Sequence, residues 1–410
     1  MIPIAKPFLD EKEEKTVSEV ILSGWITQGP KVKEFEDSFA AFVGSKYACA
    51  GSSCTTALHL ALITVGVRPG DIVITVSHSF IATANAIRHC GAEPVFVDID
   101  PKTFNMSPNS LRKCIEDDCE MKDNELFYKH ISKILHNESP LRSIKNSRIG
   151  RIKAFIPVHQ MGMPCDIGRI VSIANEYNIP VVEDAACAIG SKVNIKGEWD
   201  EIGKPHGNIA CFSLHPRKII TTGDGGIITT NNKEYDKKIR LLRNHGMNIP
   251  ADERHNSKKV KIENYITTGY NYRMTDIQAA VGIEQLKKLP KIIVERRRID
   301  KLYRKFLANI NWLELPYEPD YAVTNWQSYP VKVLKGSPIS RNELIQYLLH
   351  KDIAAKPGIM NAHSEKPYLN AEYFFKNSEE ARNQIILLPL FYGIGEKNVT
   401  YIASTIQKIV

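Results

Sequence analysis

The chain has 410 residues, which is too long for one small core and fits a large domain with a smaller one. Hydrophobic residues make up 43% of it and charged residues 24%, values that are ordinary for a globular protein and exclude a disordered chain. The formal net charge of +8 comes from scattered basic residues, which favours a generally cationic surface over a nucleic-acid-binding stripe.

The cysteines and the N-terminal segment indicate the cellular compartment of the protein. The eight cysteines contain no Cys-x-x-Cys pair and no metal-ligand spacing, and several stand inside apolar runs. Free buried thiols in a reducing compartment are therefore expected, rather than disulfides or a metal site. The segment MIPIAKPFLDEKEEK is charged too early for a secretory signal, and no apolar run approaches the roughly 18 residues that span a membrane. We expect a soluble, cytoplasmic protein.

Short apolar, β-branched runs alternate with helical patterns through the first part of the chain. The runs are DIVITV (71–76), EPVFVDI (93–99), IKAFIPVH (152–159), IPVVEDAA (179–186), IACFSLH (209–215) and GGIITT (225–230). Residues 55–66 and 167–178 have helical periodicity. Near-continuous strands that alternate with helices predict an α/β fold with a mostly parallel central sheet, covered by helices on both faces.

The alternation of predicted strands and helices is interrupted at two places. Residues 114–150 are polar and of mixed charge, which is typical of a surface insertion or a functional loop. From about residue 288, KKLPKIIVERRRIDKLYRKFLANI predicts a long charged helix, after which shorter elements and several prolines follow. We therefore predict a large domain over residues 1–287 and a small α+β domain over residues 288–410.

Polar residues stand just after the predicted strands. Asp184 lies near the end of the 179–186 run, Ser213 and Lys218 come at the end of the 209–215 run and just after it, and Phe80 follows the 71–76 run. Ligands of parallel α/β sheets bind beyond the carboxyl ends of the strands, so these residues are candidates for one site.

Their chemistry suits pyridoxal phosphate. A lysine amine forms a Schiff base with this cofactor, and a carboxylate keeps its pyridine nitrogen protonated. Lys218 precedes a Gly-rich turn, whereas a P-loop lysine follows its glycines. The helix start at Thr55 and Thr56 offers N–H groups and hydroxyls to a phosphate, with Ser213 nearby, and Phe80 can stack on a ring. Each residue alone has a commoner explanation, such as a helix cap or a core aromatic, but their joint order favours the cofactor site.

Several longer motifs resemble those of the DegT/StrS-type pyridoxal-phosphate-dependent aminotransferases of fold type I, which aminate keto sugars. The resemblance covers nearly the whole chain. The motifs that carry it are SGWITQGPKVKEFEDSFAAFVG, SCTTALHLAL, PVHQMG, VVEDAACAIGS, SLHPRKIITTGDGG, LLRNHG and GYNYRMTDIQAAVG, with GIMNAHSEKPY and LPLF near the end.

The resemblance implies specific roles at the cofactor. Lys218 would be the Schiff-base lysine and Asp184 the partner of the pyridine nitrogen. The remaining cofactor contacts would come from Thr55, Thr56 and Ser213 at the phosphate and from Phe80 over the ring.

It also implies a partner chain and substrates. Asn271 would reach the phosphate of the neighbouring subunit's cofactor, which makes the protein a homodimer with shared active sites. His245 and His363 fall where the family lines its sugar site. The expected reaction transfers an amino group from an amino acid, with glutamate as the expected donor, to a keto sugar, which is expected to be nucleotide-linked.

Three features depart from the family pattern. Cys187 stands where Gln or His usually meets the 3′-oxygen of the cofactor, and Cys54 replaces a glycine of the phosphate segment. The insertion at 114–150 exceeds the usual connection.

Other functions remain open at this stage. A sugar dehydratase of the same family carries His in place of the lysine, and Lys218 argues against it even though His215 lies three residues earlier. A pyridoxal-phosphate-binding regulatory protein without turnover is disfavoured by the Asp184–Lys218 pair. A nicotinamide oxidoreductase is disfavoured because no G-x-G-x-x-G motif follows the first strand.

Overall fold

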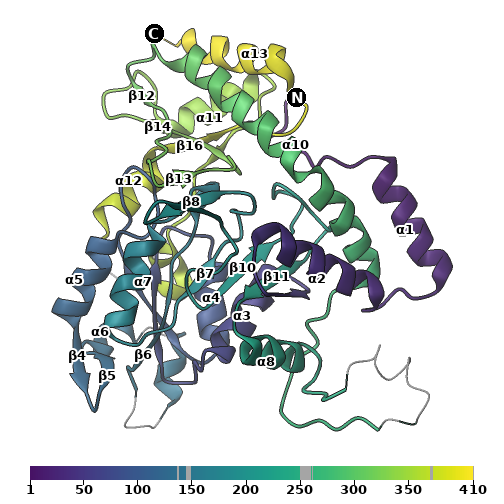
Figure 1. Ribbon diagram of the computed structural model, residues 1–410. Helices are drawn as coiled ribbons and strands as arrows, with labels where there is room; N and C mark the ends of the chain where they lie inside the picture. Colours follow the sequence, from purple (N-terminus) through teal and green to yellow (C-terminus); the bar gives the residue numbers. More distant parts are fainter. Residues whose placement is uncertain (136–137, 145–148, 250–259, 261, 370–372, 410) are drawn as a thin grey trace.

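The computed structural model describes residues 1–135, 138–144, 149–249, 260, 262–369 and 373–409. A central sheet occupies the middle of the molecule (Figure 1). Its strands are β1 (Tyr47–Gly51), β2 (Ile72–Val76), β3 (Glu93–Val97), β6 (Ile152–Ile156), β7 (Val182–Asp184), β10 (Ile209–Ser213) and β11 (Gly226–Thr230).

The strand directions confirm the predicted α/β class. Strands β3, β2 and β6 are parallel neighbours, and β7 is parallel to β10. Parallel bridges between Phe155 and Val181 and between Val158 and Asp184 join these two groups. Strands β11 and β1 add to β10 in the antiparallel direction, so the sheet is mostly parallel with an antiparallel edge.

Helices cover both faces of the sheet because its strands are apolar on both sides. In β10, Ala210 and Phe212 belong to one buried cluster, and Ile209 and Cys211 belong to the other. The first cluster includes side chains of α2 (Pro30–Val43), α5 (Pro108–Asp118) and α7 (Ile167–Glu176). The second includes side chains of α3 (Cys54–Thr64), α4 (Ala82–His89) and α8 (Lys233–Arg243).

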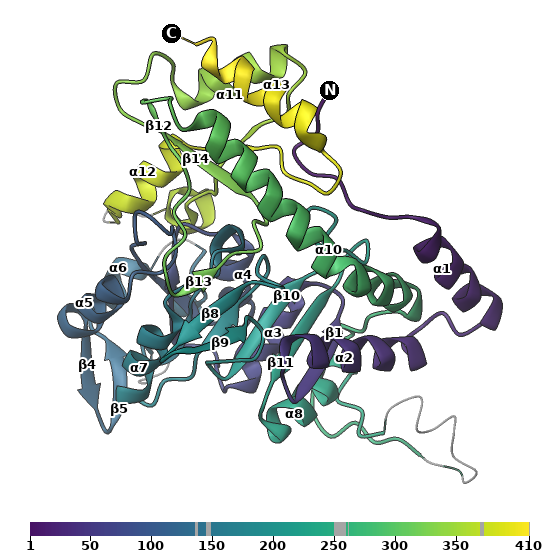
Figure 2. The same ribbon diagram turned by 45° about the horizontal axis from the view of Figure 1, so that its top comes forward.

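A second sheet lies at the opposite end of the molecule from α8 (Figures 1 and 2). Its order is β12 (Leu313–Glu314), β14 (Tyr329–Val333), β16 (Ile385–Leu388) and β15 (Lys356–Pro357). The helices of this region are α11 (Arg341–His350), α12 (Lys376–Gln384) and α13 (Gly395–Gln407). Its separate core includes Tyr303 stacked on Tyr329, with ring centroids 4.7 Å apart.

The long helix α10 (Asp276–Leu307) runs from the central sheet to the second sheet (Figure 2). It begins at Asp276, so the expected start near residue 288 is wrong. Thr275 caps the helix together with the Gln278 side chain, and Pro290 lies inside it. Asp276 also accepts hydrogen bonds from the backbone N–H groups of Gly29 and Val32 at the start of α2, at 2.8 and 3.0 Å.

The insertion at 114–150 is folded onto the core rather than lying wholly on the surface. After α5 it forms a hairpin of β4 (Cys119–Lys122) and β5 (Glu125–Tyr128), then the short helix α6 (Ile131–Ile134) and the 3₁₀ turn η1 (Pro140–Ser143). Its buried side chains include Leu126, Tyr128, Ile134 and Leu141.

Further elements lie outside the two main sheets. Helix α1 (Glu11–Ser23) packs beside α10, and the hairpin β8 (Lys192–Ile195)–β9 (Glu198–Glu201) follows β7. Strand β13 (Ala322–Val323), from the C-terminal part of the chain, pairs with β8. None of the described helices is both long and apolar enough to cross a membrane. All eight cysteines are free and all except Cys187 are buried, which confirms the expected free thiols.

Candidate active site

Asp184 and Lys218 follow neighbouring parallel strands. Asp184 is the last residue of β7 and pairs in register with Cys211 of β10. After β10 the chain makes a tight turn in which the Lys218 N–H donates to the His215 carbonyl oxygen at 2.8 Å. Because both strands end at the same edge of the sheet, the two side chains come to one place, as the sequence predicted.

Asp184 is a buried carboxylate, with 4% of its surface exposed. It accepts hydrogen bonds from the Thr83 hydroxyl at 2.7 Å and from the Ala186 N–H at 3.2 Å. Burial raises the pKa of Asp184 above its usual value. Within the described ranges no Lys, Arg or His forms an ion pair with it. A buried carboxylate of this kind favours a positive partner, and the protonated pyridine nitrogen of pyridoxal phosphate is one.

Lys218 is the cation of the site, and its amine meets a thiol rather than a carboxylate. Its Nζ donates to Cys187 Sγ at 3.0 Å. Burial opposes the charge, but Cys187, Cys54 and Asp184 together raise the pKa of Lys218. No ion pair holds this amine among the described residues, so once it has lost its proton it is free to bond a carbonyl carbon.

The start of α3 lies beside the same strands. A Cβ on Gly226 of β11 would come within 2.3 Å of the Ser53 carbonyl oxygen, which requires glycine there. Ser53 and Thr56 form a capping box, in which the Thr56 hydroxyl bonds the Ser53 N–H and carbonyl at 3.1 and 2.8 Å. The Thr56 hydroxyl is therefore less available to a phosphate than the sequence suggested. The Thr55 side chain makes no hydrogen bond in the described part of the chain.

Ser213 ends β10 and Phe80 follows β2, two strands that β6 and β7 separate in the central sheet. The Ser213 hydroxyl, opposite Gly226 in the sheet, accepts a long hydrogen bond of 3.4 Å from the His215 N–H. Phe80, between β2 and α4, exposes 65% of its surface. An aromatic ring so exposed at a strand end suits stacking on a flat ligand.

Thr83 is a contact of Asp184 that sequence reasoning missed. It lies in α4, and its hydroxyl also contacts the Ser79 hydroxyl at 3.0 Å. A threonine one helical turn after Phe80, in the segment SFIATANAI, is the signal that could have found it.

His245 and Asn271 lie together, but the structure does not join them to Lys218 within one chain. His245 has a left-handed φ of 58° and its N–H donates to the Tyr270 carbonyl at 2.8 Å. An antiparallel bridge links Asn244 to Asn271, and the side chains of His245 and Asn271 are both exposed.

His363 is enclosed, with 4% of its surface exposed. Its Nδ1 lies 2.5 Å from the Ser77 hydroxyl and its Nε2 lies 3.6 Å from Glu379. The pKa of His363 is lowered by burial despite Glu379. It borders a surface hollow that Arg382 and Tyr373 also line.

The two cysteine departures both face the site. Cys187 replaces an amide or imidazole with a thiol and meets Lys218 directly. Cys54, 9% exposed, is the first residue of α3, and burial raises the pKa of its thiol, with Asp184 adding to the shift.

His215 does not take the place of Lys218. Its Nδ1 accepts a hydrogen bond from the Arg217 N–H at 3.1 Å, so the imidazole is held within the turn that follows β10. The amine of Lys218, rather than the imidazole, contacts Cys187, which argues against a dehydratase site.

Comparison with known proteins decides the family. The profile of the DegT/DnrJ/EryC1/StrS aminotransferase family matches residues 7–407. The chain belongs to this family. It is therefore a pyridoxal-phosphate-dependent aminotransferase of the sugar aminotransferase group, as the motifs predicted.

Relatives of this aminotransferase support the assignment along its full length. It is 34% identical to the uncharacterized protein MJ1066 of Methanocaldococcus jannaschii, over 100% of this chain and 97% of that protein. It is 32% identical to the spore coat polysaccharide biosynthesis protein SpsC of Bacillus subtilis, over 100% and 97%. It is 33% identical to the GDP-perosamine synthase of Caulobacter vibrioides, over 100% and 98%.

Solved structures agree with the fold. The putative sugar aminotransferase Spr1654 of Streptococcus pneumoniae in its PLP form is 26% identical, with a TM-score of 0.81 over 100% of this chain and 99% of that one. Its PMP form gives a TM-score of 0.84 over the same shares at the same identity.

Proposed function

We propose that this aminotransferase moves the amino group of glutamate onto a keto sugar carried by a nucleotide, and that the product enters a glycan or a secondary metabolite. The observation that carries the proposal is a buried pair of residues. Among the described residues, Asp184 has no ionic partner and the Lys218 amine is hydrogen-bonded only to the Cys187 thiol. The relatives named for perosamine and for spore coat polysaccharide support a sugar acceptor. The net charge of +8 suits an anionic nucleotide.

Each residue has a task when pyridoxal phosphate is bound. The cofactor supplies an electron sink for the carbon that exchanges its amino group. Asp184, oriented by the Thr83 hydroxyl and the Ala186 N–H, keeps a proton on the pyridine nitrogen. Lys218 would hold the cofactor through its Nζ, and the same amine would serve as the general base that moves a proton at the substrate carbon.

Other residues bind and orient the cofactor. The N-terminus of α3, with Thr55 and Thr56, and the Ser213 hydroxyl would hold the phosphate, because free N–H groups and the positive end of the helix favour an anion. Phe80 would cover the ring. Cys187 replaces the stronger hydrogen-bond partner of its relatives, so we expect a weaker contact at the 3′-oxygen.

We also propose that two copies of the chain share each site. Asn271 and His245 are exposed in a segment that also displays apolar side chains, with 61% of Tyr265 and 64% of Ile266 accessible. Asn271 would contact the cofactor phosphate of the second copy, and His245 and His363 would border the sugar. Exposed apolar groups beside polar ones are typical of a subunit interface. We place the reaction in the cytoplasm, where eight free thiols are stable.

The experiment is a substrate panel. Full-length protein with pyridoxal phosphate and glutamate is incubated with nucleotide-linked keto sugars, and product masses are read. We expect replacement of the sugar oxygen by an amino group, and no product from a Lys218→Ala control. Loss of water without a gain of nitrogen would show a dehydratase instead. No turnover of any sugar, with glutamate converted to its keto acid, would refute the acceptor class.

A further inference from the structure

A short segment of the C-terminal part of the chain reaches back over the active site. It lies between β13 and β14, and its amide side chains Asn325 and Gln327 bind loops that follow β7 and β10 of the central sheet. Both are buried, with 0% and 8% of their surfaces exposed. We call these two side chains the amide clasp.

The amide clasp holds both loops that carry the cofactor residues. Asn325 Nδ2 donates to the carbonyl oxygens of Cys187 and Ile189 at 2.9 and 2.8 Å, in the loop that follows Asp184. Gln327 Nε2 donates at 2.7 Å to the carbonyl oxygen of Arg217, which is the residue before Lys218. Within the clasp, the Gln327 N–H donates to Asn325 Oδ1 at 2.8 Å.

The amide clasp therefore holds the backbone on both sides of the contact between Lys218 Nζ and Cys187 Sγ. Cys187 is bonded by Asn325 through its carbonyl and by Lys218 through its thiol. The peptide before Lys218 is bonded by Gln327. A shift of the clasp would change the distance between Lys218 Nζ and Cys187 Sγ.

The backbone beneath the clasp is strained, and a buried cation supports it. Trp326, between the two amides, has a left-handed φ of 51°. The Nη1 of Arg296, on α10, donates to the carbonyl oxygens of Trp326 and Gln327 at 2.7 and 3.1 Å. Arg296 is 3% exposed and forms no ion pair in the described part of the chain. A buried cation held only by carbonyls is costly, so stability alone does not account for it.

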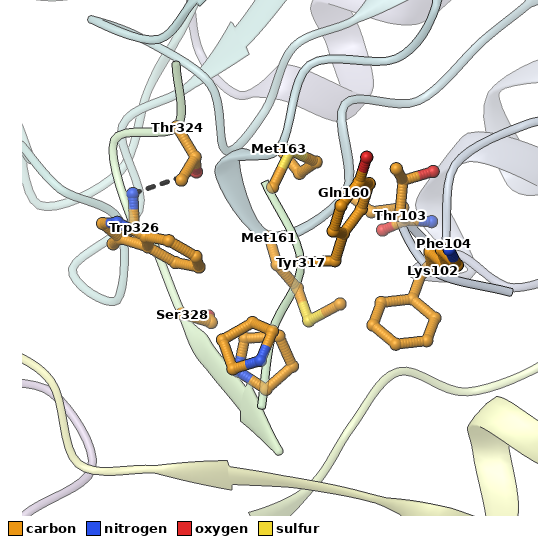
Figure 3. A pocket seen from close by; sticks show the side chains of 12 residues that line it. Lys102, Thr103, Phe104, Gln160, Met161, Met163, Tyr317, Thr324, Trp326 and Ser328 are labelled. Carbon is orange, nitrogen blue, oxygen red and sulfur yellow. Dashed lines mark hydrogen bonds between the residues drawn. The ribbon is translucent and has the colours of Figure 1, made fainter. Parts of the chain in front are cut away.

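A second strained residue packs against the same place. Met161 has a φ of 55° and lies with Trp326 in one crevice, where the Trp326 N–H also donates to the Thr324 hydroxyl at 3.1 Å (Figure 3). The next residue, Gly162, could not carry a side chain, because a Cβ would lie 2.0 Å from Asn325 Oδ1. Strain of this kind persists where the surroundings fix a functional geometry.

One polar atom of the clasp is left unpaired. Gln327 Oε1 is buried and has no hydrogen-bond partner among the described residues. Because an unpaired buried acceptor lowers stability, a residue selected only for folding would not leave it so.

We propose that Asn325 and Gln327 are positioning residues that set Lys218 against Cys187, so that the placement of the C-terminal part of the chain controls the reactivity of the cofactor lysine. The proposal rests on the role of Lys218 in the proposed function. It assigns these side chains no contact with substrate, since they act through backbone carbonyls.

The test uses the full-length protein and two readouts that a purely structural role would not change. Without cofactor, iodoacetamide should modify Cys187 before the seven buried cysteines, and peptide mapping gives its rate. With pyridoxal phosphate bound, a pH titration of the visible absorption reports the environment of the lysine. The variants are Gln327→Met and Asn325→Asp. The control is Gln407→Met in α13, which removes a hydrogen bond of 2.6 Å from Gln407 Nε2 to the Phe306 carbonyl oxygen of α10.

We expect Gln327→Met to raise the alkylation rate of Cys187 about fivefold, the effect of losing one hydrogen bond, and Asn325→Asp, which loses two, to raise it by more. Both clasp variants should shift the absorption titration. Gln407→Met should change neither readout. Wild-type behaviour in both clasp variants, or an equal change in the control, would overturn the proposal. If Gln327→Met does not fold, Asn325→Asp decides, since it keeps the shape of the side chain. Borohydride attachment of the cofactor to a lysine other than Lys218 would refute the proposed function instead, and the alkylation rates would still test the clasp contacts.

Discussion

Replacing Asp184 by Asn should reduce catalysis while leaving the fold intact. An amide of the same shape can still accept the Thr83 hydroxyl bond of 2.7 Å. It has no negative charge, so it cannot keep a proton on the pyridine nitrogen, and the ring withdraws electrons less well.

The size of the effect follows from the hydrogen bond that is lost. A hydrogen bond to a charged group contributes about 1.5–3 kcal/mol. Since about 1.4 kcal/mol corresponds to a factor of ten in rate, Asp184→Asn should slow transamination by at least about 10- to 150-fold. The buried position of Asp184 places the true value toward the upper end.

The stability of the cofactor-free protein should change in the opposite direction. Burial raises the pKa of Asp184, so the folded state binds this proton more tightly than the unfolded state does. The stability contributed by the group is therefore present at low pH and is lost as the pH rises through its unfolded and then its folded pKa. Asp184→Asn removes that loss, so at neutral pH we expect a Tm equal to or above that of the wild type.

The assay pairs single-turnover reaction with glutamate, followed by absorbance, with thermal unfolding from pH 3 to pH 8. Asp200→Asn is the control, because Asp200 is paired with Lys204 and His206 in the β9 hairpin. Near-normal turnover in a folded Asp184→Asn protein would refute the reasoning and mean that another acid serves the nitrogen.

Three further outcomes are expected. Borohydride should fix the cofactor to the peptide that contains Lys218, and Lys218→Ala should lose transamination yet still bind pyridoxamine phosphate; attachment elsewhere contradicts the assignment. Lys218→Ala mixed with Asn271→Ala should recover activity toward half that of the wild type, and an active monomer would refute shared sites. Although burial disfavours its charge, Cys165 and Glu183 raise the pKa of His159 to about 10, so His159 should contribute stability that falls between about pH 6.5 and 10. In His159→Gln, the free energy of unfolding should no longer fall between these pH values. A fall equal to that of the wild type would contradict the prediction.

The sequence was sufficient for the residues that follow strands. Asp184 and Lys218 could be predicted together because parallel strands bring their carboxyl ends to one edge, whatever the connections between them. Thr83 was missed because it acts from a helix, where the neighbouring turn of α4 decides which hydroxyl reaches a strand.

The amide clasp could not be predicted from the sequence, for a different reason. Asn325 lies 138 positions from Cys187, and only tertiary packing brings them together. The start of α10 was placed too late, near residue 288, because the capping box of Thr275 and Gln278 that begins the helix at Asp276 was not recognised. The apolar half of the 114–150 insertion is hidden in mixed-charge sequence and becomes apparent only when Leu126 and Tyr128 are seen buried.

Helix α10 has a mechanical consequence. Its first residue, Asp276, binds the start of α2, and Arg296, roughly 30 Å farther along at 1.5 Å per residue, supports the backbone of the amide clasp. An uninterrupted helix transmits displacement instead of absorbing it, so the second sheet cannot swing freely while α2 stays still. If the two ends of this molecule move relative to each other during turnover, α10 should bend at Pro290, because a backbone hydrogen bond is missing there. A Pro290→Ala protein should then have a helix α10 that bends less than that of the wild type.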